Sequence, residues 1–297
     1  MSELSSCSLC PRNCKINRHT GVGFCGAKDK IKVARAALHF WEEPCISGKN
    51  GSGTIFFSHC NLACVFCQNH EISHVGFGKE ISISDCASLF LKLQAMGAHN
   101  INLVTPTPYA PLIMEALDIV KDRLNIPVVY NCGGYENPEL IENLNPYIDI
   151  YLTDFKYYDK TLSKKYSFAE DYSEFALASL EKMIKTKGEP KIKDGIMERG
   201  VIVRHLVLPT CREDSKKIIS LLKEKFGTDK FILSLMAQYF PPENLPDFPE
   251  INRKITSFEY DSVVNFAYDS GFKNAYIQGR ESAMESFVPP FDLSGVD

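Results

Sequence analysis

GTIFFSHCNLACVFCQN, residues 53–69, joins an apolar run typical of a buried β-strand to three closely spaced cysteines. Cys60, Cys64 and Cys67 are separated by three and then two residues, a C-x3-C-x2-C pattern. Three thiolates at this spacing can bind one four-iron, four-sulfur cluster and leave one of its irons without a protein ligand. An open coordination position allows chemistry, whereas four protein ligands usually make a closed structural site. A zinc site or an ordinary iron–sulfur site is the alternative interpretation.

The composition is that of an ordinary soluble globular protein with enough apolar residues for a core. The chain has 297 residues, of which 44% are hydrophobic and 24% charged, and its formal net charge is -4. This mild negative charge predicts no general attraction to nucleic acid or to anionic membranes. No apolar run is long enough to span a membrane, and the N-terminal sequence lacks a hydrophobic secretion core. We therefore expect a cytoplasmic protein that binds neither nucleic acid nor membrane.

A second group of cysteines lies near the N-terminus. Cys7, Cys10, Cys14 and Cys25 form a C-x2-C-x3-C-x10-C pattern, which supplies enough thiolates for a closed tetrahedral site. The spacing does not distinguish zinc from a second iron–sulfur cluster, and four free thiols in a loop are the plainer alternative. A short segment with little apolar content needs such ligation to fold. The pattern predicts a small Cys-rich metal-binding segment at residues 1–50, followed by one large domain at residues 51–297.

Short β-rich runs alternate with longer helical patterns through the rest of the chain. The strand candidates are nearly continuously apolar, as expected for parallel strands covered on both faces, and comprise residues 54–59, 101–104, 127–131, 148–153, 200–207 and 230–235. The helix candidates fall at about 83–97, 110–123, 137–143, 173–187, 213–225 and 256–271. Six successive βα units predict an α/β fold with a partial parallel (βα)6 barrel. Chemistry in such folds lies at the carboxyl ends of the strands.

Motif and fold pattern together resemble the radical S-adenosylmethionine (SAM) superfamily, whose members share an open six-unit barrel. The runs CSLCPRNCKINR, GVGFCG and INLVTPTPYAP further resemble a branch related to pyruvate formate-lyase-activating enzyme. The resemblance implies a 4Fe–4S cluster at the three cysteines of residues 53–69, with SAM bound at the open iron. It also implies an oxidoreductase that receives an electron from a flavodoxin- or ferredoxin-type reductant.

The same resemblance implies a reaction. Reductive cleavage of SAM yields a 5′-deoxyadenosyl radical, which abstracts a hydrogen atom from the substrate. In the activating enzymes that substrate is a backbone glycine of a partner, a glycyl-radical enzyme. A shared branch does not establish a shared substrate. The alternatives are a radical enzyme acting on a small molecule or another protein side chain, and a non-catalytic iron–sulfur or zinc protein.

Charged residues at two strand ends are candidates for catalysis and cofactor binding. Asp154 and Lys156, in Thr-Asp-Phe-Lys after the fourth strand, resemble the Asp-x-Lys segment of the activating enzymes, which implies catalytic roles beside the cofactor. A salt-bridged strand end is the alternative. Arg204 interrupts an apolar strand, so it should point toward a carboxylate, since an unpaired buried cation is very costly. It resembles the activating-enzyme arginine that meets the cofactor. His205 points to the opposite face and is expected to be structural.

Further cofactor contacts are expected at other strand ends. The activating enzymes have Gly-Gly-Glu after the second strand, where this chain has Thr105 and Thr107 between prolines, so a stiff turn is the alternative there. Asn131 ends the third strand beside two glycines, and Gln238 follows the sixth. Cys132 is expected to be a small buried core residue, and a thiol hydrogen-atom donor at the barrel mouth is the alternative. The Pro-rich stretch at 238–255 is expected to cover the barrel mouth, and Gly279-Arg280-Glu281 to close the barrel.

Overall fold

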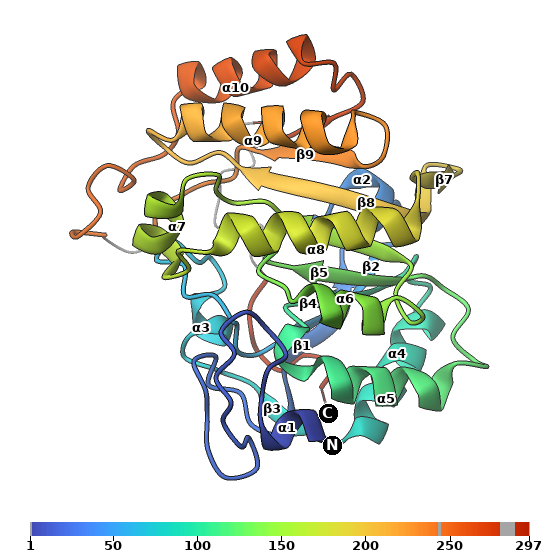
Figure 1. Ribbon diagram of the computed structural model, residues 1–297. Coiled ribbons are helices and arrows are strands. Elements are labelled where there is room, and N and C mark those ends of the chain that lie inside the picture. The colour runs from blue at the N-terminus through green and yellow to red at the C-terminus, as the bar shows by residue number, and fades with distance from the viewer. Residues whose placement is uncertain (1, 243–244, 280–288, 297) are drawn as a thin grey trace.

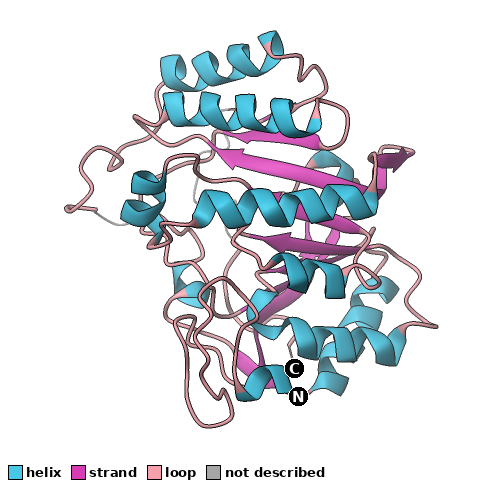
Figure 2. Ribbon diagram, viewed as in Figure 1, coloured by secondary structure: helices cyan, strands magenta, loops and turns pink. Residues whose placement is uncertain are grey.

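The structure is a computed structural model that describes residues 2–242, 245–279 and 289–296. Its centre is a ten-stranded sheet flanked by helices (Figure 1, Figure 2). Six neighbouring strands are parallel and follow one another in chain order. They are β2 (Ser52–Phe57), β4 (Ile101–Val104), β5 (Val128–Cys132), β6 (Ile150–Asp154), β8 (Ile196–Leu206) and β9 (Ile232–Met236). The predicted α/β fold with six parallel strands is confirmed.

The six expected helices connect or follow these strands, and in Figure 1 several of them cross in front of the sheet. They are α4 (Ile83–Ala95), α5 (Ala110–Val120), α6 (Pro138–Leu144), α8 (Tyr172–Lys187), α9 (Arg212–Phe226) and α10 (Ser257–Asp269). Helix α4 begins where the sequence predicts, and Ser82 and Asp85 form a capping box that satisfies two backbone amides. Gly97 follows this helix with a φ of 86°, a left-handed conformation that glycine adopts without strain.

Several short elements have no counterpart in the sequence analysis: α1 (Ser2–Ser5), β1 (Ile31–His39), α2 (Pro44–Ser47), α3 (His70–Ser73), β3 (Lys79–Ile81), the 3-10 turn η1 (Thr107–Tyr109), α7 (Lys160–Ser167), β7 (Lys191–Lys193) and β10 (Tyr276–Ile277). Strand β1 pairs antiparallel with β2 and with β3, and β10 extends the other edge in parallel with β9. The first 50 residues therefore contain a strand of the main sheet, β1, and a helix that packs on this sheet, α2.

The two faces of the sheet pack against different partners. Outward side chains such as Tyr130, Tyr151 and Val203 belong to the main core under the helices. Their neighbours Val129, Leu152 and Ile202 belong to a second cluster, formed with Cys45 and Ile46 of α2. This alternation follows from the two-residue period of a strand. Helix α2 therefore fills the inner face of the sheet near the amino ends of the strands, and the carboxyl ends lie above it.

The loops at the carboxyl ends pack together. In the described part of the Pro-rich stretch, Tyr239 contacts Phe66 with ring centroids 6.0 Å apart, and Tyr166 of α7 donates a hydrogen bond to Glu250 at 2.6 Å. This stretch therefore lies against the cysteine loop, and its first residue, Gln238, lines the cavity described below. Arg280 and Glu281 lie outside the described residues. No helix in the described ranges has the length and apolar character needed to cross a membrane.

Candidate functional site

A cavity of about 490 Å³ lies at the carboxyl ends of the parallel strands. This volume falls in the range of about 300–1,000 Å³ that small-molecule sites occupy. Cys64, Phe66 and Cys67 of the cysteine loop line it. The inner faces of all six parallel strands also contribute side chains: Phe56, Val104, Asn131, Asp154, Arg204 and Met236. Because inner-face residues alternate along each strand, the fold brings these positions together from distant parts of the sequence.

Each cysteine of the three-cysteine motif has a polar partner. The Cys64 sulfur accepts a hydrogen bond from the Ser167 hydroxyl at 3.0 Å, and the Cys67 sulfur lies 3.2 Å from the Ser73 hydroxyl. The backbone amide of Leu62 donates to Cys60 at 3.4 Å. Burial raises the pKa of all three thiols, to about 11 for Cys67. Iron ligation requires thiolates, so binding a cluster here would release protons.

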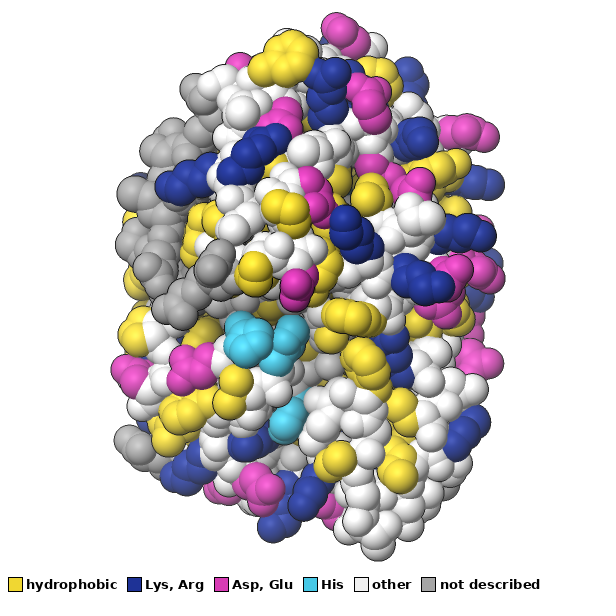
Figure 3. All heavy atoms as spheres, turned by 90° about the vertical axis from the view of Figure 1, so that its left-hand side faces the viewer, with side chains coloured by type: hydrophobic (Ala, Val, Ile, Leu, Met, Phe, Trp, Pro, Cys, Tyr) yellow, Lys and Arg dark blue, Asp and Glu magenta, His cyan; other side chains and the backbone are white. Residues whose placement is uncertain are grey.

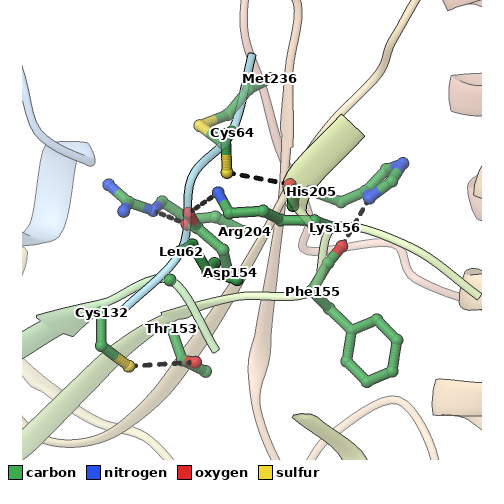
Figure 4. Close-up of polar contacts among 12 residues, drawn as sticks. Leu62, Cys64, Cys132, Thr153, Asp154, Phe155, Lys156, Arg204, His205 and Met236 are labelled. Carbon is green, nitrogen blue, oxygen red and sulfur yellow. Dashed lines mark hydrogen bonds and ion pairs between the residues drawn. The ribbon is translucent and has the colours of Figure 1, made fainter. Parts of the chain in front are cut away.

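Asp154 holds two cations at the wall of the cavity. Its carboxylate accepts hydrogen bonds from Arg204 Nε at 2.8 Å and from Lys156 Nζ at 2.5 Å, one on each oxygen (Figure 4). Asp154 and Arg204 are direct neighbours in the register of β6 and β8. Burial raises the pKa of Asp154, but the two cations more than offset this effect and bring the pKa below its usual value. The structure thus brings together the three charged residues singled out in the sequence.

Arg204 also contacts a residue of β5 and a residue of the loop before α2. Its Nη2 donates to Asn131 Oδ1 at 2.7 Å, and its Nη1 lies 3.3 Å from Glu42 Oε2. Glu42 lies in the loop between β1 and α2, and its Oε1 accepts hydrogen bonds from Asn131 and Asn102. Glu42 and its neighbour Glu43 line the cavity but are absent from the sequence-based expectations. The available signal is a pair of adjacent glutamates in Phe-Trp-Glu-Glu-Pro after an apolar run.

Of the remaining residues expected to contact the cofactor, Gln238 lines the cavity, whereas Thr105 and Thr107 do not. The side-chain oxygen of Gln238 accepts a hydrogen bond from Gln278 at 3.3 Å. Thr105 has a φ of 57°, unusual for a β-branched residue, and its backbone amide donates to the Asn131 carbonyl at 2.8 Å. Thr107 points away from the cavity, because η1 directs its hydroxyl to the buried carboxylate of Glu136 at 2.8 Å. The expectation that this hydroxyl faces the cofactor does not fit its position.

Two residues that were expected to be structural lie outside the cavity wall. Buried His205 contacts the Phe155 carbonyl at 2.7 Å and the Ser215 hydroxyl at 2.8 Å, and burial lowers its pKa to about 4. Cys132 is also buried, and its thiol donates to Thr153 at 3.4 Å (Figure 4). Both side chains point to the outer face of their strands, as the two-residue period predicts.

The four N-terminal cysteines surround one small cavity of about 20 Å³, which Gly23 and Arg12 also line. A Cβ atom on Gly23 would lie 3.0 Å from the Cys14 sulfur, so the close approach of this turn requires glycine. Asn13 and Lys15, on either side of Cys14, both have left-handed φ values, 44° and 54°. Such strain in non-glycine residues is typical of sites where the backbone is held for a function.

Arg12 joins this N-terminal site to the cysteine loop of the large cavity. Its Nε donates to the Asn61 carbonyl at 2.9 Å, and its Nη1 donates to the Phe168 carbonyl at 2.5 Å. Asn61 directly follows Cys60, so the two cysteine groups lie on adjacent segments. No three His, Cys, Asp or Glu side chains in the described ranges have the spacing of ligands around a single metal ion.

A three-cysteine motif that follows the first parallel strand and faces a cavity at the strand ends defines a class of iron–sulfur proteins with α/β folds. The family model of the radical SAM superfamily matches residues 54–255, more than half of the chain. The chain therefore belongs to the radical SAM superfamily. This family implies a 4Fe–4S cluster and SAM as cofactors.

Individual relatives add little about the substrate. An uncharacterized protein of Methanocaldococcus jannaschii is 32% identical over 275 residues, which cover 88% of this chain and 74% of that protein. Methylornithine synthase aligns at 14% identity with a TM-score of 0.48, covering 79% of this chain and 67% of that chain. SuiB of Streptococcus suis bound to S-adenosylmethionine aligns at 13% identity with a TM-score of 0.49, covering 74% and 48% of the two chains. Similarities this distant carry no information about the substrate.

Proposed function

We propose that this chain holds a 4Fe–4S cluster through Cys60, Cys64 and Cys67 and cleaves SAM reductively. The observation that carries the proposal is that two of these cysteines line the same cavity as the Asp154–Arg204 ion pair. When reduced, such a cluster supplies the electron that splits SAM into methionine and a 5′-deoxyadenosyl radical, which takes a hydrogen atom from the substrate. The protein supplies ligation, orientation and exclusion of water.

In this proposal the charged residues bind and orient the cofactor. Arg204 has partners on Nε, Nη1 and Nη2, so it acts mainly by fixing Asp154 and Asn131. Lys156 has three ammonium protons, and Asp154 accepts one of them. The other two are available for an anionic group in the cavity, such as the carboxylate of SAM. Asn131, Gln238 and the strained turn at Thr105 complete the expected cofactor contacts.

The test is anaerobic reconstitution of the full chain with iron and sulfide, followed by incubation with SAM and dithionite. We expect formation of 5′-deoxyadenosine, measured by mass spectrometry, that depends on both the reductant and the reconstituted cluster. A reconstituted protein that carries four irons but forms no 5′-deoxyadenosine would favour the non-catalytic iron–sulfur alternative.

The substrate belongs to one of two kinds. The resemblance to activating enzymes supports a backbone glycine of a partner glycyl-radical enzyme. The closed inner face below the cavity, filled by α2, supports a small molecule or a side chain that enters the cavity. Deuterium transfer into 5′-deoxyadenosine from a labelled candidate substrate distinguishes the two, and a glycyl radical is also visible by electron paramagnetic resonance.

The electron is proposed to come from a flavodoxin- or ferredoxin-type protein in the cytoplasm. Figure 3 shows the left-hand side of Figure 1, toward which β8 runs, with histidines grouped near its middle among apolar side chains. His70 and His74, on and after α3, have ring centroids 4.7 Å apart and follow Cys67 closely in sequence. We propose that the reductant binds near α3, because this helix directly follows the cysteine motif in the sequence.

We also propose that Cys7, Cys10, Cys14 and Cys25 bind zinc or a second iron–sulfur cluster. Replacing both Cys7 and Cys10 with alanine is expected to remove this metal, because only two of the four thiolates remain. Elemental analysis should show a loss of about one zinc or about four irons per chain. Cys86→Ala, a buried cysteine on α4, is the matched control and should keep the full metal content. Equal metal content in both variants would contradict a tetrathiolate site.

A further inference from the structure

The floor of the large cavity is built from a loop that the cofactor chemistry does not use. Residues 40–43 connect β1 to α2, and α2 packs on the inner face of the sheet below the cavity. Glu42 and Glu43 lie at this floor. The cysteine loop follows the carboxyl end of β2, at the mouth. A chain of contacts runs from Lys156 through Asp154 to Arg204 and Glu42, and it separates the floor of the cavity from its mouth. The two glutamates therefore lie away from the cysteines.

Among the described residues, the charges that line the cavity do not balance. Lys156 and Arg204 are its cations, and Asp154, Glu42 and Glu43 are its carboxylates. Arg204 uses its three kinds of nitrogen on Asp154, Glu42 and Asn131. His39 also lines the cavity, but burial lowers its pKa to about 4 and leaves it neutral near pH 7. When all three carboxylates are ionised, one negative charge, that of Glu43, is therefore in excess among the described residues at the floor.

The polar atoms left over at the floor are acceptors. Glu43 is 8% exposed, and its Oε2 has no hydrogen-bond partner in the structure. Asn102, fully buried on β4, does not line the cavity but donates its amide to Glu42, and among the described residues its Oδ1 has no partner. None of the buried side-chain nitrogens in the described ranges lacks a partner. Leaving a buried acceptor unsatisfied is costly, so a ligand that donates hydrogen bonds and carries positive charge fits this floor.

We propose that Glu43, supported by Glu42, binds a protonated amine of the substrate and so sets which hydrogen atom faces the cofactor. This inference rests on the proposed function and names the substrate class: a compound with an aliphatic amine, free or as a lysine side chain. The amino group of SAM is not the cation meant, because that end of the cofactor belongs at the cluster, beyond the Lys156–Asp154–Arg204 contacts.

The test uses the reconstituted, SAM-loaded protein and calorimetric binding of three probes. n-Pentylamine is the small cation, Nα-acetyl-lysinamide carries the same cation on a peptide-like backbone, and n-pentanol is the neutral control. We expect at least one amine to bind and the alcohol to bind about 10-fold more weakly or not at all. The tighter amine identifies the source of the cation. If the wild-type protein cleaves SAM and neither amine binds, the inference is wrong while the proposed function stands.

Substitution of the carboxylate gives the decisive comparison. Glu43→Gln keeps the shape and should weaken amine binding about 10- to 100-fold, whereas Glu43→Asp should retain part of it. Glu198→Gln, an exposed glutamate on β8, is the control and should bind as the wild type does. If Glu43→Gln weakens SAM binding and leaves amine binding unchanged, the carboxylate serves the cofactor and the inference is overturned.

The pH dependence adds a second readout. Burial raises the pKa of Glu43 to about 7, and Arg204 partly offsets this rise. Its other titratable neighbours are Glu42, Cys45 and Tyr276. Burial raises the pKa of Cys45 to about 11 and raises that of Tyr276 as well, so both stay neutral near pH 7. The probes stay protonated, so their affinity should rise between pH 6 and about pH 8, and the rise should vanish in Glu43→Gln.

Discussion

Replacing Cys64 with alanine is expected to reduce 5′-deoxyadenosine formation to the level of a protein-free control. Cys64 is buried beside Ser167, whose hydroxyl donates to its sulfur at 3.0 Å. Alanine offers no ligand, and the two remaining cysteines are too few for a stable cluster with one open iron. Lys156, which partly offsets the raised pKa of this thiol, keeps its ion pair with Asp154 in this variant. Iron and sulfide content should fall together with activity.

Cys132→Ala is the matched control for this prediction. Its thiol is buried as well, but it lies on the outer face of β5 and contacts Thr153 instead of the cavity. We expect this variant to bind the cluster and cleave SAM as the wild type does. The cluster assignment would be contradicted if Cys64→Ala kept wild-type iron content and activity, or if both variants lost them equally.

The regular part of the fold and the row of charges at the strand ends could be predicted from the sequence. Apolar runs such as that of β8 mark the parallel strands, and the two-residue period places Arg204 inward and His205 outward. Asp154 and Lys156 are two residues apart, so on an extended chain their side chains point to the same side. These features depend on local pattern, which a single sequence displays directly.

Glu42 and Glu43 could not be found in this way. Their position depends on β1, whose residues IKVARAALH mix Ala, Lys and Arg and show no clean alternation. Only the antiparallel pairing of β1 with β2 brings the following loop over the inner face of the sheet. The direction of the Thr107 hydroxyl is hidden for a related reason, since its hydrogen-bond partner Glu136 is a buried carboxylate 29 residues further along the chain. Long-range contacts of this kind leave no periodic signal.

Replacing Arg204 with methionine is expected to destabilise the protein and to abolish SAM cleavage. The side chain is 16% exposed and contacts both Asp154 and Glu42, so its removal leaves Lys156 as the one cation among the described residues that line the cavity with three carboxylates. Removing one partner of a buried ion pair costs about 3–5 kcal/mol. In a chain of this size the loss corresponds to a fall in melting temperature of roughly 5–15 °C. Differential scanning calorimetry of the metal-free protein measures this fall without interference from the cluster.

The pH dependence of the stability loss in Arg204→Met tests whether unpaired carboxylates cause this loss. Burial already raises the pKa of Glu42 and Glu43 above their unfolded-state values, and without Arg204 both should rise further. A group with a raised folded-state pKa favours the folded protein at low pH, and this benefit is lost as the pH rises through that value. The deficit of Arg204→Met should therefore be smaller near pH 6 than near pH 8. Adding Glu43→Gln to the variant should recover part of the lost stability, because the excess charge is removed.

Arg199→Met is the control, because Arg199 lies on the same strand but is exposed and donates to the Thr186 carbonyl at 2.8 Å. Loss of this hydrogen bond should cost about 1 kcal/mol, with little dependence on pH. The prediction would be contradicted if Arg204→Met lost no more stability than Arg199→Met, or if its loss of stability were the same at pH 6 and pH 8. The carboxylates that line the cavity would then have to be neutral or paired with other groups. The excess negative charge at the cavity floor, on which amine recognition depends, would then not exist.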